Sequence, residues 1–155
     1  MASHETFMAL ALLESQKALP ACLPNPPVGC VLVRNEQIVA SGYTRAPGEY
    51  HAEADALAKI LEPMTGLTAY VTLEPCSFHG RTPSCADELI KQGIEKVVVA
   101  LLDPDPRNNG RGLKKLCQAG VEVVQGVYAE KVSEFLETYL YQADSDLKSN
   151  DGSHE

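Results

Sequence analysis

Three candidate metal ligands that lie far apart in the sequence constrain how this chain folds. His51, Cys76 and Cys85 offer one imidazole and two thiolates, and they can bind one zinc ion only if their three segments converge. Structural zinc sites usually have four protein ligands, whereas three ligands leave the fourth position open for water. Glu53, two residues after His51, then remains as an acid or base. The pattern predicts a catalytic zinc site.

Apolar runs alternate with segments of helical periodicity along the chain. Two short runs, over residues 28–33 and 37–43, flank a polar turn and predict a β-hairpin. Helices are predicted over residues 4–19, 51–61, 82–92, 112–119 and 129–141, and further strands over 68–73, 95–102 and 121–125. Strands that alternate with helices after a hairpin predict an α/β sandwich with a mixed sheet.

The predicted element boundaries bring the three ligands together. His51 and Cys85 fall at helix N-termini, the second of these opened by Thr82 as N-cap and Pro83 in the first turn. Cys76 follows a strand. All three are therefore expected at one edge of the sheet, where helix N-termini favour the thiolate that binds metal.

Length and composition point to one domain and to a reducing compartment. We expect the 155 residues to form a single domain over 1–143, followed by a polar tail over 144–155 that is predicted to be disordered. The odd cysteine count indicates free thiols, and the remaining three cysteines are predicted to be small buried hydrophobes: Cys22, Cys30 and Cys117.

The net charge and the lengths of the apolar runs limit which classes of partner and which cellular location are expected. The net charge of −8 disfavours binding to nucleic acid or to an anionic membrane. No apolar run approaches the roughly 20 residues of a membrane span, and no signal peptide is recognisable. The sequence predicts a cytoplasmic protein.

Two residues near the cysteines leave open whether the zinc ion has a fourth protein ligand. Glu74 lies two residues before Cys76, and on an extended segment both side chains would point the same way. A Glu74 ligand would close the coordination shell and make the site structural. His79 is another possible ligand, although a loop histidine more often faces solvent or substrate.

The segment around the cysteines resembles a known family. Residues 74–85 read Glu-Pro-Cys-Ser-Phe-His-Gly-Arg-Thr-Pro-Ser-Cys, which closely resembles the zinc loop of the riboflavin-biosynthesis pyrimidine deaminases. Cytidine, deoxycytidylate and tRNA adenosine deaminases usually carry these cysteines two residues apart, whereas eight residues separate them here. Further agreement comes from Asn25-Pro26, from Gly48 and from Gly110-Arg111-Gly112-Leu113.

The resemblance, which covers roughly residues 5–126, implies a fold and a set of roles. The fold would be that of cytidine deaminase, a three-layer α/β/α sandwich around a five-stranded mixed sheet, here without the reductase domain common in the family. The zinc ligands would be His51, Cys76 and Cys85, and Glu53 the proton shuttle. The remaining matches place Asn25 near the pyrimidine and Arg81 near a ribose phosphate.

Several positions depart from the family pattern. The family usually has histidine where this chain has Thr44 and Phe78, and often where it has Asp55. These positions are expected around the substrate, with His79, so the exact heterocycle stays open. Weaker candidates for a phosphate contact are Arg45, Arg107 and Arg111.

The leading hypothesis is a zinc-dependent hydrolase that releases ammonia from an amino-pyrimidine. The resemblance implies diaminohydroxyphosphoribosylaminopyrimidine, of riboflavin biosynthesis, or a related nucleotide or heterocycle as the substrate. Two alternatives remain: a non-catalytic zinc-binding regulatory or scaffolding relative, and a deaminase of a base in nucleic acid. Association into a homodimer or homotetramer is also expected.

Overall fold

Five apolar segments pair into one mixed β-sheet in the computed structural model, which describes residues 3–63, 65–77 and 84–142. The strands are β1 (Gly29–Arg34), β2 (Gln37–Tyr43), β3 (Thr68–Leu73), β4 (Lys96–Leu101) and β5 (Glu122–Val124). Their order is β2-β1-β3-β4-β5; β1 is antiparallel to β2 and β3, whereas β4 is parallel to β3 and β5. The predicted hairpin and mixed sheet are confirmed.

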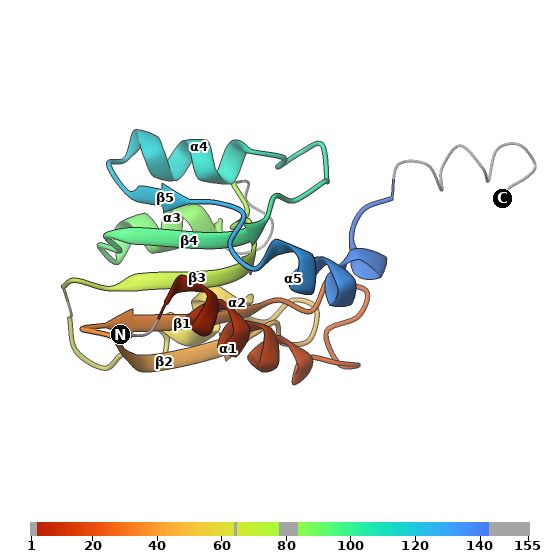
Figure 1. The fold of residues 1–155 in the computed structure, drawn as a ribbon, viewed down its shortest axis with the longest axis horizontal. Helices are drawn as coiled ribbons and strands as arrows, with labels where there is room; N and C mark the ends of the chain where they lie inside the picture. The colour runs from red at the N-terminus through yellow and green to blue at the C-terminus, as the bar shows by residue number, and fades with distance from the viewer. Residues whose placement is uncertain (1–2, 64, 78–83, 143–155) are drawn as a thin grey trace, which may run out of the picture.

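Helices cover both faces of this sheet (Figure 1). One face packs against α1 (His4–Gln16) and α5 (Ala129–Leu136), and the other against α2 (Ala52–Leu57), α3 (Cys85–Lys91) and α4 (Arg111–Gln118). Because β3, β4 and β5 are consecutive and parallel, right-handed crossovers place α3 and α4 on the same face. The expected three-layer α/β/α sandwich is confirmed.

The central strands are buried on both faces, as the continuous apolar run of β4 predicts. Residues 97–100 of β4 and 69–73 of β3 are buried, whereas the first three residues of the edge strand β2 are exposed. No helix among the described residues is both long and apolar enough to cross a membrane.

Several predicted helix boundaries differ from the structure. Ser84, and not Thr82, caps α3, and its Oγ accepts a hydrogen bond from the Asp87 N–H at 3.1 Å. Ser84 followed three residues later by an acid is the capping-box spacing, so the sequence did contain the signal. Thr82 and Pro83 lie outside the described residues. The last predicted helix ends at Leu136 and continues as a 3₁₀ turn, η1 (Glu137–Tyr139).

Gly42 allows α2 to lie directly on β2. A Cβ at this position would stand 2.5 Å from both the Ala52 oxygen and the Ala56 nitrogen, which are helix backbone atoms with little freedom to move. Gly42→Ala is therefore expected to lower the free energy of unfolding by about 1–3 kcal/mol, measured by urea denaturation. Ser41→Ala, one residue earlier and only half-buried, is the control. Equal stability of the two variants would contradict this packing.

Candidate metal centre and cavity

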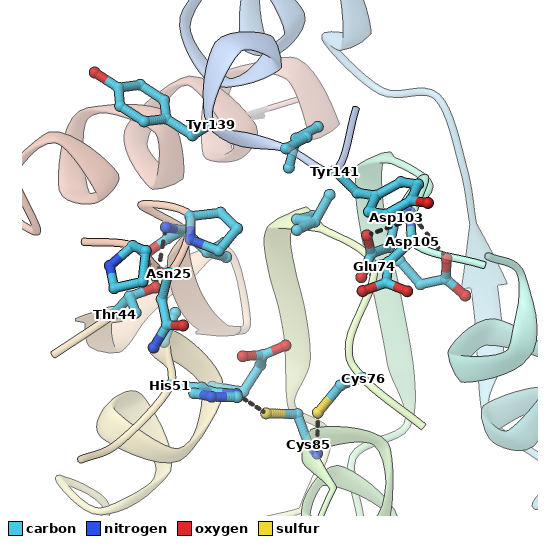
Figure 2. A pocket seen from close by; sticks show the side chains of 17 residues that line it. Asn25, Thr44, His51, Glu74, Cys76, Cys85, Asp103, Asp105, Tyr139 and Tyr141 are labelled. Carbon is cyan, nitrogen blue, oxygen red and sulfur yellow. Dashed lines mark hydrogen bonds between the residues drawn. The ribbon is translucent and has the colours of Figure 1, made fainter. Parts of the chain in front are cut away.

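The three predicted ligands meet at one edge of the sheet. His51 is the N-cap of α2, Cys76 lies just after the end of β3, and Cys85 is the first residue of α3. One ligand atom from each residue lies within 4.8 Å of the other two. The His51 Nδ1 is 3.3 Å from the Cys85 Sγ, and the Cys85 N–H donates to the Cys76 Sγ at 3.2 Å (Figure 2).

The contact between the sulfurs of Cys76 and Cys85 gives the two thiols different pKa values. The hydrogen bond from the Cys85 thiol lowers the pKa of Cys76 to about 4. The same contact, together with burial, raises the pKa of Cys85 well above its usual value. Cys76 is therefore the cysteine of this pair that more readily supplies a thiolate, which is the form of cysteine that binds metals.

The chemistry of these donors fits zinc. One imidazole and two thiolates are nitrogen and sulfur ligands of the kind that zinc prefers, and three protein ligands are typical of catalytic sites. No fourth His, Cys, Asp or Glu joins the group within residues 3–63, 65–77 and 84–142. His79, the other histidine considered as a ligand, lies outside the described residues.

Glu74 does not act as the fourth ligand that its spacing allowed. Its buried carboxylate accepts hydrogen bonds from the backbone N–H groups of Asp103 at 3.0 Å, Gly110 at 2.9 Å and Leu113 at 3.1 Å. The alternation argument was wrong because β3 ends at Leu73, before either side chain. Glu74 instead ties the end of β3 to the start of α4.

Glu53 lies beside the three candidate ligands, in the first turn of α2. Its side chain is only 3% exposed, and burial raises the pKa of its carboxyl to about 7. A carboxyl with a pKa close to neutral pH can both accept and release a proton, which suits a general acid and base.

A cavity of about 390 Å³ opens above Glu53 and above the metal group, which consists of the three candidate ligands His51, Cys76 and Cys85. Asn25 and Thr44 line one side, and Asp103 and Asp105 line the other (Figure 2). The hydroxyl of Thr44 accepts the Val28 N–H at 3.1 Å. The cavity thus includes Asn25 and Thr44, whose contacts with substrate stay predictions.

One further residue predicted near the substrate, Asp55, does not line the cavity. Asp55 faces β2, where its carboxylate accepts the Tyr43 N–H and the Arg45 Nε, both at 3.1 Å. The expectation for Asp55 was wrong because it lies two residues past Glu53 on the helix and faces the sheet. The three predicted substrate contacts in the cysteine loop lie outside the described residues: Phe78, His79 and Arg81.

None of the three weaker arginine candidates lines the cavity. Arg45 pairs with Asp55, Arg107 pairs with Asp105 at 2.7 Å, and Arg111 is exposed at the start of α4. The described cavity wall contains no Lys or Arg.

Sequence reasoning missed one wall of the cavity and misplaced one cysteine. Residues 139–141, at the end of η1, line the cavity from the side opposite the metal group. No sequence signal marked them, since their spacing only continued the pattern of the last helix.

Cys22 and Cys30 are buried as predicted, but Cys117 is exposed, because Leu113 and Leu116 form the inner face of α4.

Comparison with known proteins places the chain among zinc deaminases. Residues 1–101 match the cytidine and deoxycytidylate deaminase zinc-binding region. The riboflavin biosynthesis protein RibD of Escherichia coli (strain K12) is 46% identical over 136 residues, which are 88% of this chain and 37% of that protein. The diaminohydroxyphosphoribosylamino-pyrimidine deaminase of Buchnera aphidicola subsp. Schizaphis graminum is 43% identical, covering 83% of this chain and 88% of that protein.

A solved structure agrees in fold as well as in sequence. The diaminohydroxyphosphoribosylaminopyrimidine deaminase/5-amino-6-(5-phosphoribosylamino)uracil reductase of Thermotoga maritima superposes with a TM-score of 0.82 at 42% identity. The match covers 88% of this chain and 40% of that one, so the chain spans well under half of this relative and of E. coli RibD. The chain therefore belongs to the cytidine and deoxycytidylate deaminase family, in which its relatives are the RibD-type diaminohydroxyphosphoribosylaminopyrimidine deaminases.

Proposed function

We propose that this protein catalyses the zinc-dependent hydrolytic deamination of an amino-pyrimidine, with diaminohydroxyphosphoribosylaminopyrimidine as the leading substrate. The observation that carries the proposal is the meeting of three ligand atoms within 4.8 Å beside a buried carboxyl, at the floor of a cavity. The similarity to the diaminohydroxyphosphoribosylaminopyrimidine deaminases of Buchnera and Thermotoga supports this substrate.

The residues of the site divide the chemistry between them. His51, Cys76 and Cys85 would hold the zinc ion, which when bound supplies a Lewis acid that lowers the pKa of water toward about 7. Glu53 accepts the proton of the attacking water at its carboxylate and delivers it to a ring nitrogen, which makes the amino-bearing carbon electrophilic. The same carboxylate then takes the second proton, from the hydroxyl that has added to this carbon, and gives it to the departing amine, so that ammonia leaves and a ring carbonyl remains.

The size of the cavity favours a small heterocycle over a base in a polynucleotide. A volume of about 390 Å³ lies within the range of small-molecule sites. The net charge of −8 also opposes binding to a polyanion.

Zinc quantitation combined with an ammonia-release screen tests the proposal, with the riboflavin-pathway pyrimidine, cytosine nucleotides and purine analogues as substrates. Stoichiometric zinc without ammonia release would instead support the non-catalytic relative.

Arg81 is the proposed contact for a substrate phosphate. Arg81→Ala is expected to raise KM for the phosphorylated pyrimidine by about tenfold or more, because a charge-assisted hydrogen bond contributes about 1.5–3 kcal/mol. The KM of the dephosphorylated compound should hardly change. Steady-state kinetics on both compounds measures the difference, with Arg111→Ala as the control. An equal effect on the two substrates would refute the assignment.

A further inference from the structure

Asn108 holds the backbone on both sides of Cys76. Its side chain is completely buried, its Oδ1 accepts the Ser77 N–H at 3.1 Å, and its Nδ2 donates to the Pro75 oxygen at 3.2 Å. Cys76 itself lies on irregular backbone after β3, outside any helix or strand. One amide side chain therefore fixes the two peptide groups that determine where the Cys76 sulfur points.

Lys115 joins the segments of the two cysteines. Its Nζ donates to the Ser77 oxygen at 3.1 Å and to the Asp87 Oδ2 at 2.9 Å. The same Asp87 carboxylate accepts the hydroxyl of Ser84 at 2.7 Å, in the residue directly before Cys85. Lys115 thus contacts both the residue after Cys76 and the first turn of the helix that begins with Cys85.

The backbone of α4 packs against the same loop. A Cβ at Gly112 would collide with the Pro75 oxygen, so only glycine permits this approach. Glu74 reaches in the opposite direction, to the N–H groups of Gly110 and Leu113. The contacts in both directions make the start of α4 a rigid support for the cysteine loop.

We infer that Asn108 and Lys115 are positioning residues that set the placement of the Cys76 and Cys85 sulfurs, and thereby the affinity of the site for zinc. This inference rests on the proposed zinc site. Neither residue lines the cavity or belongs to the metal group, so both act through the backbone and the helix that carry the ligands. Mutation of a residue that orients a metal ligand in this way typically weakens metal affinity by about 10- to 100-fold.

The test measures zinc affinity directly, by competition with a chromophoric chelator. Asn108→Ala and Lys115→Met are each expected to raise the Kd for zinc by about 10- to 100-fold. Lys114→Met, an exposed lysine on the same helix, should leave the Kd unchanged. Lys115→Arg, which keeps a cation that can reach the same oxygens, should recover part of the loss. Cobalt substituted for zinc should show weaker sulfur-to-metal charge-transfer absorption in the first two variants than in the wild type.

The outcomes separate this inference from the proposed function. If the wild type binds one zinc ion and both variants match its Kd and cobalt spectrum, the positioning roles are overturned while the deaminase proposal stands. If the wild type binds no zinc, both are overturned. Should Asn108→Ala fail to fold, Lys115→Met decides, since Lys115 is only half-buried and methionine retains most of its aliphatic length.

Discussion

Glu53→Gln is expected to lower kcat for ammonia release by at least about 10²–10⁴-fold while the protein keeps its zinc and its fold. The amide has nearly the shape of the carboxyl but cannot accept a proton from water or pass one to the pyrimidine ring. Glu53 is not among the three candidate ligands, and its near-complete burial means that a neutral side chain is well tolerated there. Steady-state ammonia release, zinc content and circular dichroism measure the three properties.

The control for this variant is Glu49→Gln, which makes the same chemical change at an exposed position just before α2. It should retain wild-type kcat. A near-normal rate in Glu53→Gln would remove the acid and base mechanism proposed for this site. Loss of zinc in that variant would instead assign Glu53 to the coordination of the metal.

Cys85→Ser is expected to abolish stoichiometric zinc binding, and activity with it. Serine keeps the size of the side chain, but its hydroxyl has a much higher pKa than a thiol and is a poor zinc ligand. The Kd for zinc should rise by more than the factor of about 10 to 100 that is expected for residues that only orient the ligands. Metal analysis after dialysis against a weak chelator measures it.

Cys117→Ser provides the matched control, because Cys117 is an exposed free thiol on α4, outside the metal group. This variant should keep one zinc ion and full activity. A Cys85→Ser protein that retained stoichiometric zinc under the same dialysis would show that the metal is held by other residues.

The sequence was sufficient to predict the sheet, the helices and the convergence of the three candidate ligands, because these follow from where the local patterns begin and end. The apolar run of β4 and the hairpin of β1 and β2 are readable from periodicity alone. The convergence of His51, Cys76 and Cys85 follows from placing each at the end of an element. Side-chain directions at those ends were less predictable, as Glu74 and Asp55 show, since each depends on where a strand or helix stops.

Long-range contacts were beyond the reach of sequence patterns. Asn108 is polar and lies in a turn, which would ordinarily place it in solvent, yet it is fully buried against the cysteine loop. Only the packing of α4 on that loop explains its burial. The roles of Phe78, His79 and Arg81, the tail over 144–155, the cytoplasmic location and the homodimer or homotetramer stay predictions.

The contribution of residues 139–141 to the cavity bears on how the protein can be engineered. These residues follow the final helix, so shortening the chain to before Tyr139 would remove part of the chamber in which the pyrimidine is expected to bind. In Figure 1 α1 begins at the left of the view, whereas α5 lies further to the right on the same face of the sheet. Purification tags and immobilisation chemistry are therefore better attached ahead of α1.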